Sequence, residues 1–185
     1  MFATQVIDDG LPKRYADYLE KLMLTDFPWL VLDNKWYVPE KPDGVITEGF
    51  TLSLCCPVGN PSSPFFNIFS AVPYLLSEKF NYTGPIKISQ IRPFMQMPTG
   101  KNELNTIHVD FEYPHLVLLQ YVNDSDGDTY FFDQNRQNVI DKIEYKANRF
   151  ALFDGRYFHT GHTPTSKKRI VISYTLKLES YDELK

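Results

Sequence analysis

The sequence predicts a mainly β domain, a sandwich or barrel, with helices packed against its outside. After residue 85, short apolar segments alternate with turn signals at the interval typical of many short strands. Aromatic residues make up 15% of the chain, with 14 Phe and 12 Tyr, and aromatic residues favour strands. Helical spacing of apolar residues is found in two stretches, both before residue 85.

The first predicted helix covers residues 11–24, where apolar side chains recur at Tyr15, Tyr18, Leu19, Leu22 and Met23. The second covers residues 66–79, and its proline at position 73 is expected to kink or bound it. Short extended pieces between the helices are predicted at residues 29–34, 35–38 and 50–56.

The strands predicted for the second half of the chain are residues 87–97, 105–111, 115–122, 128–132, 139–145, 149–153, 156–160 and 169–178. The segment 115–122, HLVLLQYV, is apolar on both faces, as expected of a strand that lies between two layers. We therefore expect one domain over residues 1–185. Residues 1–84 supply helices and supporting strands, and residues 85–180 form the β core.

Charge and composition exclude several classes of protein. The net charge of −4 argues against a nucleic-acid partner, because such domains usually carry a basic face. The first ten residues lack the basic start and apolar run of a signal peptide, and no apolar stretch is long enough to cross a bilayer. The two cysteines, Cys55 and Cys56, are adjacent and make no disulfide framework. We expect a soluble, cytoplasmic protein without a membrane partner.

A histidine and a carboxylate stand two residues apart in the predicted strand 105–111. His108 and Asp110 would therefore project from the same face of that strand. The pair alone is more often a hydrogen-bonded pair at a sheet edge. A second imidazole from the segment RYFHTGHTP, His159 or His162, would complete a set of two histidines and one carboxylate. That set suits non-haem Fe(II), whereas Zn²⁺ with similar ligands usually serves hydrolysis.

Arg169 begins the last predicted strand, 169–178. Alternation places it on one face with Val171, Ser173 and Thr175. A guanidinium on such a face is suited to a carboxylate, which it binds as a fork. The neighbouring Lys167 and Lys168 are interpreted instead as a solvated basic turn, whereas Arg169 is not.

The order His108-x-Asp110, then His159 after forty-eight intervening residues, then Arg169 resembles the Fe(II)- and 2-oxoglutarate-dependent dioxygenase superfamily. The similarity is to the prolyl-4-hydroxylase-like branch and its compact bacterial and phage members, and it covers about residues 85–178. GDTYFF at 127–132 and NRFALFDGRYFHTGHTP at 148–164 are similar to segments that flank the site in this superfamily. The resemblance implies a double-stranded β-helix, or jelly roll, with the N-terminal helices packed outside.

The resemblance also implies roles for individual residues. His108, Asp110 and His159 resemble the ligands of the catalytic iron. Arg169 resembles the residue that pairs with the distal carboxylate of 2-oxoglutarate. Tyr121 resembles a hydroxyl donor beside that carboxylate, and a plain core tyrosine is an equally open interpretation.

Three further positions decide details of this hypothesis. His159 is preferred to His162 as the third ligand, because it ends an extended run and keeps the family's spacing to the arginine. Prolyl hydroxylases often carry a tyrosine on the strand before H-x-D, where this chain has Gln96 or Met97, and this departure weakens proline as the substrate. Arg92 could face the pocket, but a surface arginine is the preferred interpretation.

The function implied is a hydroxylase that uses Fe(II), 2-oxoglutarate and O₂, acting on a peptidyl or small-molecule substrate. One alternative is a jelly-roll protein that binds a metal or ligand without turnover. Another is a nucleic-acid dealkylase of the same superfamily. It is disfavoured by the negative charge and by Val171 and Thr175, which stand about where such enzymes carry an asparagine and a second arginine. A purely structural β domain would need four matched elements to coincide by chance.

Overall fold

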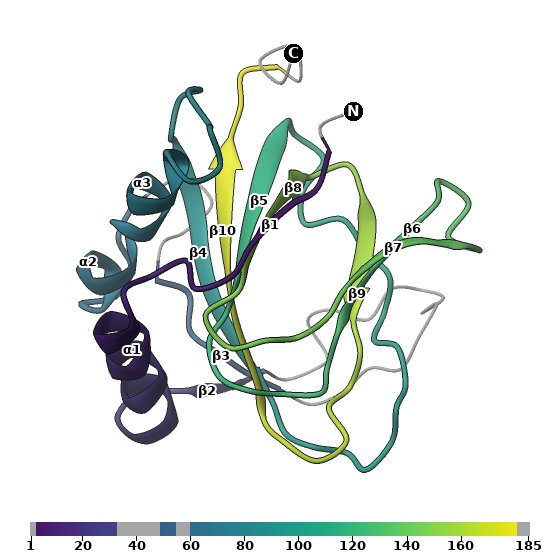
Figure 1. The fold of residues 1–185 in the computed structure, drawn as a ribbon, viewed down its shortest axis with the longest axis horizontal. Helices are drawn as coiled ribbons and strands as arrows, with labels where there is room; N and C mark the ends of the chain where they lie inside the picture. The colour runs from purple at the N-terminus through teal and green to yellow at the C-terminus, as the bar shows by residue number, and fades with distance from the viewer. Residues whose placement is uncertain (1–2, 33–48, 55–59, 181–185) are drawn as a thin grey trace.

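Two antiparallel sheets form the body of the molecule (Figure 1), in a computed structural model that describes residues 3–32, 49–54 and 60–180. The larger sheet has the strand order β1 (Gln5–Ile7), β8 (Phe150–Asp154), β5 (His115–Tyr121), β10 (Arg169–Lys177), β4 (Ile88–Gln96), β3 (Gly49–Thr51) and β2 (Leu30–Leu32). The smaller sheet has the order β7 (Val139–Ile143), β6 (Thr129–Phe132) and β9 (Phe158–Gly161).

The helices α1 (Lys13–Thr25), α2 (Phe66–Phe69) and α3 (Val72–Ser77) lie against the outer face of the larger sheet (Figure 1). The first helix therefore lies where the sequence predicts it. The second prediction, 66–79, is divided into two short helices. Pro73 stands in the first turn of α3, where its missing N–H and fixed φ are tolerated, so it marks a helix boundary, one of the two expected outcomes, and not a kink.

The central strands are buried on both faces, as the apolar pattern of residues 115–122 predicts. Ile170, Ile172 and Tyr174 of β10 pack outward against the helices, in one hydrophobic cluster with Leu19 and Phe69. Val171 of the same strand packs inward, in a second cluster that lies between the two sheets. The other buried members of this inner cluster are Val117, Leu119, Tyr121, Phe131, Ile143, Tyr145, Ala151 and Phe153.

The predicted strand 105–111 is wrong. This segment is irregular and pairs with β9 through one isolated bridge, His108 with His159, while a second isolated bridge joins Leu104 and His162 just outside the two segments. Apolar residues favour a strand only where a partner continues the ladder, and here pairing stops after single residues. The prediction at 35–38 and both cysteines lie outside the described residues, and β1 was not predicted from the sequence.

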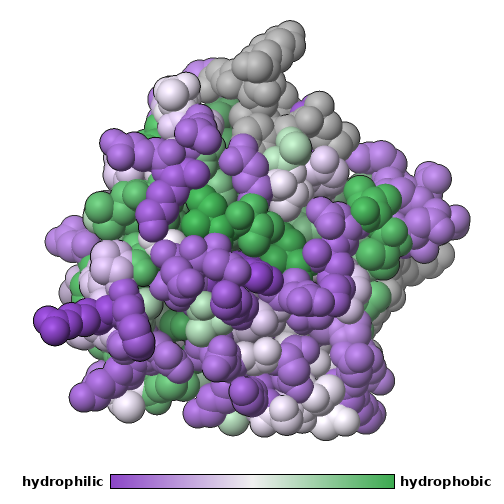
Figure 2. Space-filling model, viewed as in Figure 1, coloured by the Kyte–Doolittle hydropathy of each residue, from purple (hydrophilic) through white to green (hydrophobic). Residues whose placement is uncertain are grey.

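Hydrophilic residues cover most of the face seen in Figure 2, with hydrophobic patches at its centre and at one side. The exposed hydrophobic side chains include Val6 of β1 and Val139 and Ile140 of β7, which are the edge strands of the two sheets. Within the described ranges, none of the helices has the length and apolar character needed to cross a membrane.

Candidate metal centre

Two histidines and one aspartate meet at the end of the inner space between the sheets. Their nearest ligand atoms, from His108, Asp110 and His159, all lie within 4.8 Å of one another. Reciprocal backbone hydrogen bonds between His108 and His159, of 3.1 and 2.9 Å, hold the irregular segment 105–111 against β9. These bonds, and not a continuous strand, bring the H-x-D pair to the second histidine.

The hydrogen bonds of the two imidazoles orient them toward the carboxylate. Nδ1 of His108 lies 2.9 Å from the carbonyl oxygen of Thr106, and Nδ1 of His159 lies 3.0 Å from that of Tyr157. A carbonyl only accepts, so each Nδ1 carries the proton and each Nε2 presents its lone pair to Asp110. Peptide carbonyls thus provide the outer-shell support that metal-ligating histidines usually have.

The separations leave room for an ion. His108 Nε2 lies 3.9 Å from Asp110 Oδ1, and His159 Nε2 lies 3.9 Å from Asp110 Oδ2. These distances are too long for hydrogen bonds, yet they suit a cation with bonds of about 2.0–2.2 Å to each ligand. Asp110 Oδ2 is buried and has no hydrogen-bond partner among the residues that the structure describes. A buried carboxylate oxygen in that state is costly, and a divalent cation would satisfy it. The residues therefore fit a two-histidine, one-carboxylate metal site.

The protonation states of His159 and Asp110 are those of metal ligands. Burial is the main cause that lowers the pKa of His159 to about 4, and the neighbouring imidazole of His108 acts in the same direction, so His159 is neutral at pH 7. Burial works against the ionised form of Asp110, but attraction to His159, His108 and Arg92 more than offsets it and holds the pKa below its ordinary value. Ligating imidazole must be neutral and ligating carboxylate ionised.

The lowered pKa of His159 makes the stability of the metal-free protein depend on pH. The unfolded chain takes up the proton near pH 6.5 and the folded protein only near pH 4, so stability is lost as the pH falls between these values. The loss expected from this group is up to about 3 kcal/mol. Urea unfolding in the presence of a chelator, from pH 7 to pH 4, measures it. His159→Gln should have a flatter profile over this window, and an identical slope would contradict the assignment.

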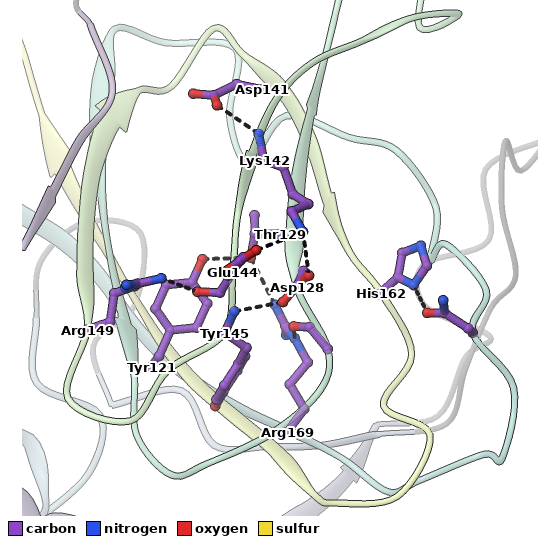
Figure 3. A network of polar contacts seen from close by, with 12 residues as sticks. Tyr121, Asp128, Thr129, Asp141, Lys142, Glu144, Tyr145, Arg149, His162 and Arg169 are labelled. Carbon is purple, nitrogen blue, oxygen red and sulfur yellow. Dashed lines mark hydrogen bonds and ion pairs between the residues drawn. The ribbon is translucent and has the colours of Figure 1, made fainter. Parts of the chain in front are cut away.

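A second polar group lies further along the same inner space, around Arg169 (Figure 3). Arg169 is the first residue of β10, and it is only 5% exposed. Nε donates to the carbonyl oxygen of Gly127 at 2.8 Å, and Nη2 donates to Oγ1 of Thr129 at 3.3 Å. The hydroxyl of Tyr121 donates to the same Oγ1 at 2.8 Å. The ring of Tyr145 lies 5.8 Å from the guanidinium carbon.

No carboxylate pairs with Arg169 among the residues that the structure describes. Burial lowers the pKa of Arg169, but an arginine keeps its charge in proteins. Burial raises the pKa of Tyr121 to about 12, so its phenol is neutral and can donate a hydrogen bond. A buried cation without a counter-ion is costly, and a ligand carboxylate would neutralise it. The structure thus brings Arg169 and Tyr121 together through Thr129, and their binding of a co-substrate carboxylate stays a prediction.

Two glycines make the space that the guanidinium occupies. A Cβ atom at Gly161 would lie 2.7 Å from Cζ and from Nη2 of Arg169. A Cβ atom at Gly127 would lie 2.6 Å from its Cδ. Any larger residue at either position would displace the arginine, so Gly127 and Gly161 belong to the arginine site although neither was singled out from the sequence.

The other two histidines lie outside the metal centre. His162 stacks near Tyr130, with ring centroids 4.8 Å apart, and its Nδ1 contacts Oδ1 of Asn102. His115 is fully buried at the start of β5, where Nδ1 donates to the carbonyl oxygen of Tyr113 at 2.7 Å. Neither is in the group of potential metal ligands found among the described residues.

The structure distinguishes the two residues that precede the loop to the H-x-D pair. Gln96 is buried and pairs with Arg169 in the β4–β10 register, and its Nε2 donates to Oδ1 of Asn105 at 2.9 Å. Met97 is 43% exposed. Gln96 therefore stands beside the arginine site, where the sequence left the choice between the two open.

Sequence reasoning missed the positions of Thr129 and Arg92. Thr129 joins Tyr121 to Arg169, although the sequence marks it only as part of Gly-x-Thr-x-Phe. Arg92 does not lie at the surface away from the site. Its Nη2 is 3.6 Å from Asp110 Oδ1, and its side chain is 39% exposed. The available signal was strand alternation, because Arg92 and Phe94 share one face of β4.

Comparison with solved structures identifies the fold. The chain is similar to a prolyl-4-hydroxylase from Pseudomonas putida, with a TM-score of 0.64 and 10% identity over 96% of this chain and 94% of that one. It is also similar to a prolyl hydroxylase from Trichoplax adhaerens in complex with a hypoxia inducible factor peptide fragment, with a TM-score of 0.62 and 16% identity over 98% and 85%. A third neighbour is the non-heme alpha ketoglutarate dependent epimerase SnoN from nogalamycin biosynthesis, with a TM-score of 0.65 and 10% identity over 94% and 77%.

No protein-family model and no curated protein matches the sequence. At the identities found, structural likeness shows the fold. The chain has the jelly-roll fold of the 2-oxoglutarate–Fe(II) oxygenases, with prolyl-4-hydroxylase-like structures among its neighbours. The mainly β fold that the sequence predicts, with helices outside it, is confirmed.

Proposed function

We propose that this protein is an Fe(II)- and 2-oxoglutarate-dependent dioxygenase that hydroxylates a peptidyl or small-molecule substrate. The observation that carries the proposal is the buried Arg169, which has no carboxylate partner among the described residues and shares an inner space with the His-Asp-His group. A protein that only stores a metal needs the three ligands alone. A buried guanidinium beside Tyr121 and Thr129 adds a place for the carboxylate of a co-substrate.

The residues have separate tasks in this proposal. Iron with bound 2-oxoglutarate supplies O₂-dependent decarboxylation to succinate and CO₂, coupled to oxidation of a substrate C–H bond. His108, Asp110 and His159 hold the metal on one side. Arg169 receives the distal carboxylate of 2-oxoglutarate, and the Tyr121 hydroxyl lies beside it as a second donor. The inner hydrophobic cluster keeps water away from this space, which strengthens the ion pair.

Hydroxylation is favoured among the reactions of these enzymes by the three prolyl hydroxylases among the neighbours, one of them bound to a peptide. The epimerase among the neighbours has the same fold, so the fold by itself permits either outcome. Dealkylation of nucleic acid is disfavoured. Val171 belongs to the inner hydrophobic cluster and Thr175 is buried, so neither position presents a charged group to a base.

One assay tests the proposal directly. The protein is incubated without O₂ with Fe(II) and 2-oxoglutarate, the visible metal–co-substrate absorption band is recorded, and O₂ is then admitted. We expect a band before O₂ and slow formation of succinate after it, even without added substrate. A protein that binds Fe(II) but gives neither the band nor succinate would be a metal-binding jelly roll without turnover.

A further inference from the structure

We propose that Arg92 binds a carboxylate group of the substrate, in a solvent-accessible region of the inner face beside the metal centre. This inference rests on the proposed function and specifies the class of substrate, an acid-bearing small molecule or peptide. It concerns a second arginine, at a different place from the Arg169 site.

The position of Arg92 in the sheet is the first support. It stands on β4 opposite Ser173 of β10, and Ser173 pairs in turn with Leu119 of β5. Leu119 belongs to the inner hydrophobic cluster. Phe94, which lies two residues after Arg92 on β4, packs against the same cluster. Arg92 therefore projects into the same space as the metal ligands, and its Nη2 approaches Asp110 Oδ1 to 3.6 Å.

The exposure of this part of the inner face is the second support. Along β4 the residues alternate between buried and half-exposed, and Arg92 and Phe94 belong to the half-exposed set. Ser173 is half-exposed, whereas Arg169 and Val171 on the same face of β10 are buried. Leu119 is also buried. Solvent therefore reaches the inner face near Arg92 and Ser173, next to the metal centre, and does not reach the Arg169 site.

Charge is the third support. With Fe(II) and 2-oxoglutarate bound, the other charges of the site sum to zero. The metal contributes two positive charges and the Arg169 guanidinium one, whereas the Asp110 carboxylate contributes one negative charge and the co-substrate carboxylates two. Arg92 then adds one positive charge in excess. Asp110 is the only carboxylate within ion-pair distance of Arg92 among the described residues, and it would also be a ligand of the metal. A substrate carboxylate would supply the missing negative charge, and a guanidinium suits it as a fork.

The competing explanation is that Arg92 only holds Asp110 in place for the metal. The two explanations differ in what they predict for Arg92→Gln. A positioning residue would weaken metal binding and slow turnover of every substrate alike. A substrate-binding residue would affect acidic substrates far more than their amides, because any change in metal affinity is common to both.

The test uses N-acetyl-L-proline, N-acetyl-L-leucine and N-acetyl-L-lysine, each as free acid and as primary amide, with the Fe(II)-loaded protein. Succinate formation above the substrate-free rate is measured for wild type, Arg92→Gln, Arg92→Lys and the control Arg14→Gln. Arg14 is exposed on α1, on the outer side of the larger sheet. In the wild type at least one acid should exceed its amide by about tenfold or more. That preference should vanish in Arg92→Gln, persist in part in Arg92→Lys and be unchanged in Arg14→Gln.

A second measurement does not depend on turnover. The protein is loaded with Mn(II) and 2-oxoglutarate without O₂, and the relaxation of the probes' acetyl protons is recorded, because Mn(II) relaxes nearby protons. Acids should be relaxed more than amides, and Arg92→Gln should remove the difference. The proposal is overturned if no acid exceeds its amide by either measurement, or if the preference survives in Arg92→Gln. Absence of any succinate, with the acid preference in relaxation intact, would overturn the dioxygenase activity and not this site.

Discussion

Replacing Asp110 with alanine is expected to abolish succinate formation and to weaken Fe(II) binding by at least about 100-fold. Loss of an outer-shell partner of a metal ligand typically costs 10–100-fold in affinity or activity, so loss of the only carboxylate ligand should cost at least as much. Asp110 also supplies the single negative charge of the three-residue group, and its side chain is only 6% exposed. Metal binding is measured by titration with Fe(II) without O₂ or with Mn(II), and turnover by succinate formation.

The matched control is Asp141→Ala, which removes an exposed carboxylate from the edge strand β7. This variant should bind metal and form succinate as the wild type does. Circular dichroism should show both variants folded, because the hydrophobic clusters on either side of the larger sheet contain neither residue. Unchanged Fe(II) affinity in a folded Asp110→Ala protein would show that this carboxylate is not a metal ligand, and it would contradict the proposed function.

Replacing Arg169 with alanine is expected to weaken the binding of 2-oxoglutarate by at least about 100-fold, because the charge-assisted hydrogen bonds to the distal carboxylate are lost. Affinity for the metal should change far less, because Arg169 touches none of the three ligands. Arg169→Lys should recover only part of the loss, since an ammonium group cannot reproduce the planar fork. The measurement is the 2-oxoglutarate dependence of the absorption band and of succinate formation.

Two comparisons make the Arg169 result decisive. Lys167→Ala removes a nearby exposed charge and should leave 2-oxoglutarate affinity unchanged. The alanine variant at 169 also leaves the Gly127 carbonyl and the Thr129 hydroxyl without this donor, so its unfolding is measured alongside, with a destabilisation of about 1–3 kcal/mol expected. Equal losses of metal and 2-oxoglutarate affinity in the folded variant would show that Arg169 has a structural role and does not bind the co-substrate.

Much of the fold was readable because local patterns and burial agree. Residues 115–122 are apolar at nearly every position, and β5 lies between the helix layer and the smaller sheet. In residues 169–178 two sets of side chains alternate, and β10 sends one set to each cluster. Strand alternation also put Arg169 on the inner face, where the structure has it.

The prediction for residues 105–111 failed because it inferred a strand from residue types alone. His108 and Asp110 do converge on His159, but a single backbone bridge to β9 brings them there. A bridge of this kind depends on a partner about fifty residues away, and no local pattern encodes it. Arg92 was misjudged for a related reason. Strand alternation put Arg92 and Phe94 on one face of β4, but it did not show that this face lies beside Ser173 and the metal centre.

The sequence by itself determined the mainly β architecture, the outer helices and the types of residue available for a metal and a carboxylate. These follow from periodicity and chemistry, which are properties of neighbouring residues. The tertiary structure alone decided that Tyr121 and Arg169 meet at Thr129, that Gly127 and Gly161 leave room for the guanidinium, and that Arg92 stands beside Asp110. Each of these depends on the register between strands far apart in the chain, and register is set by packing of the whole core.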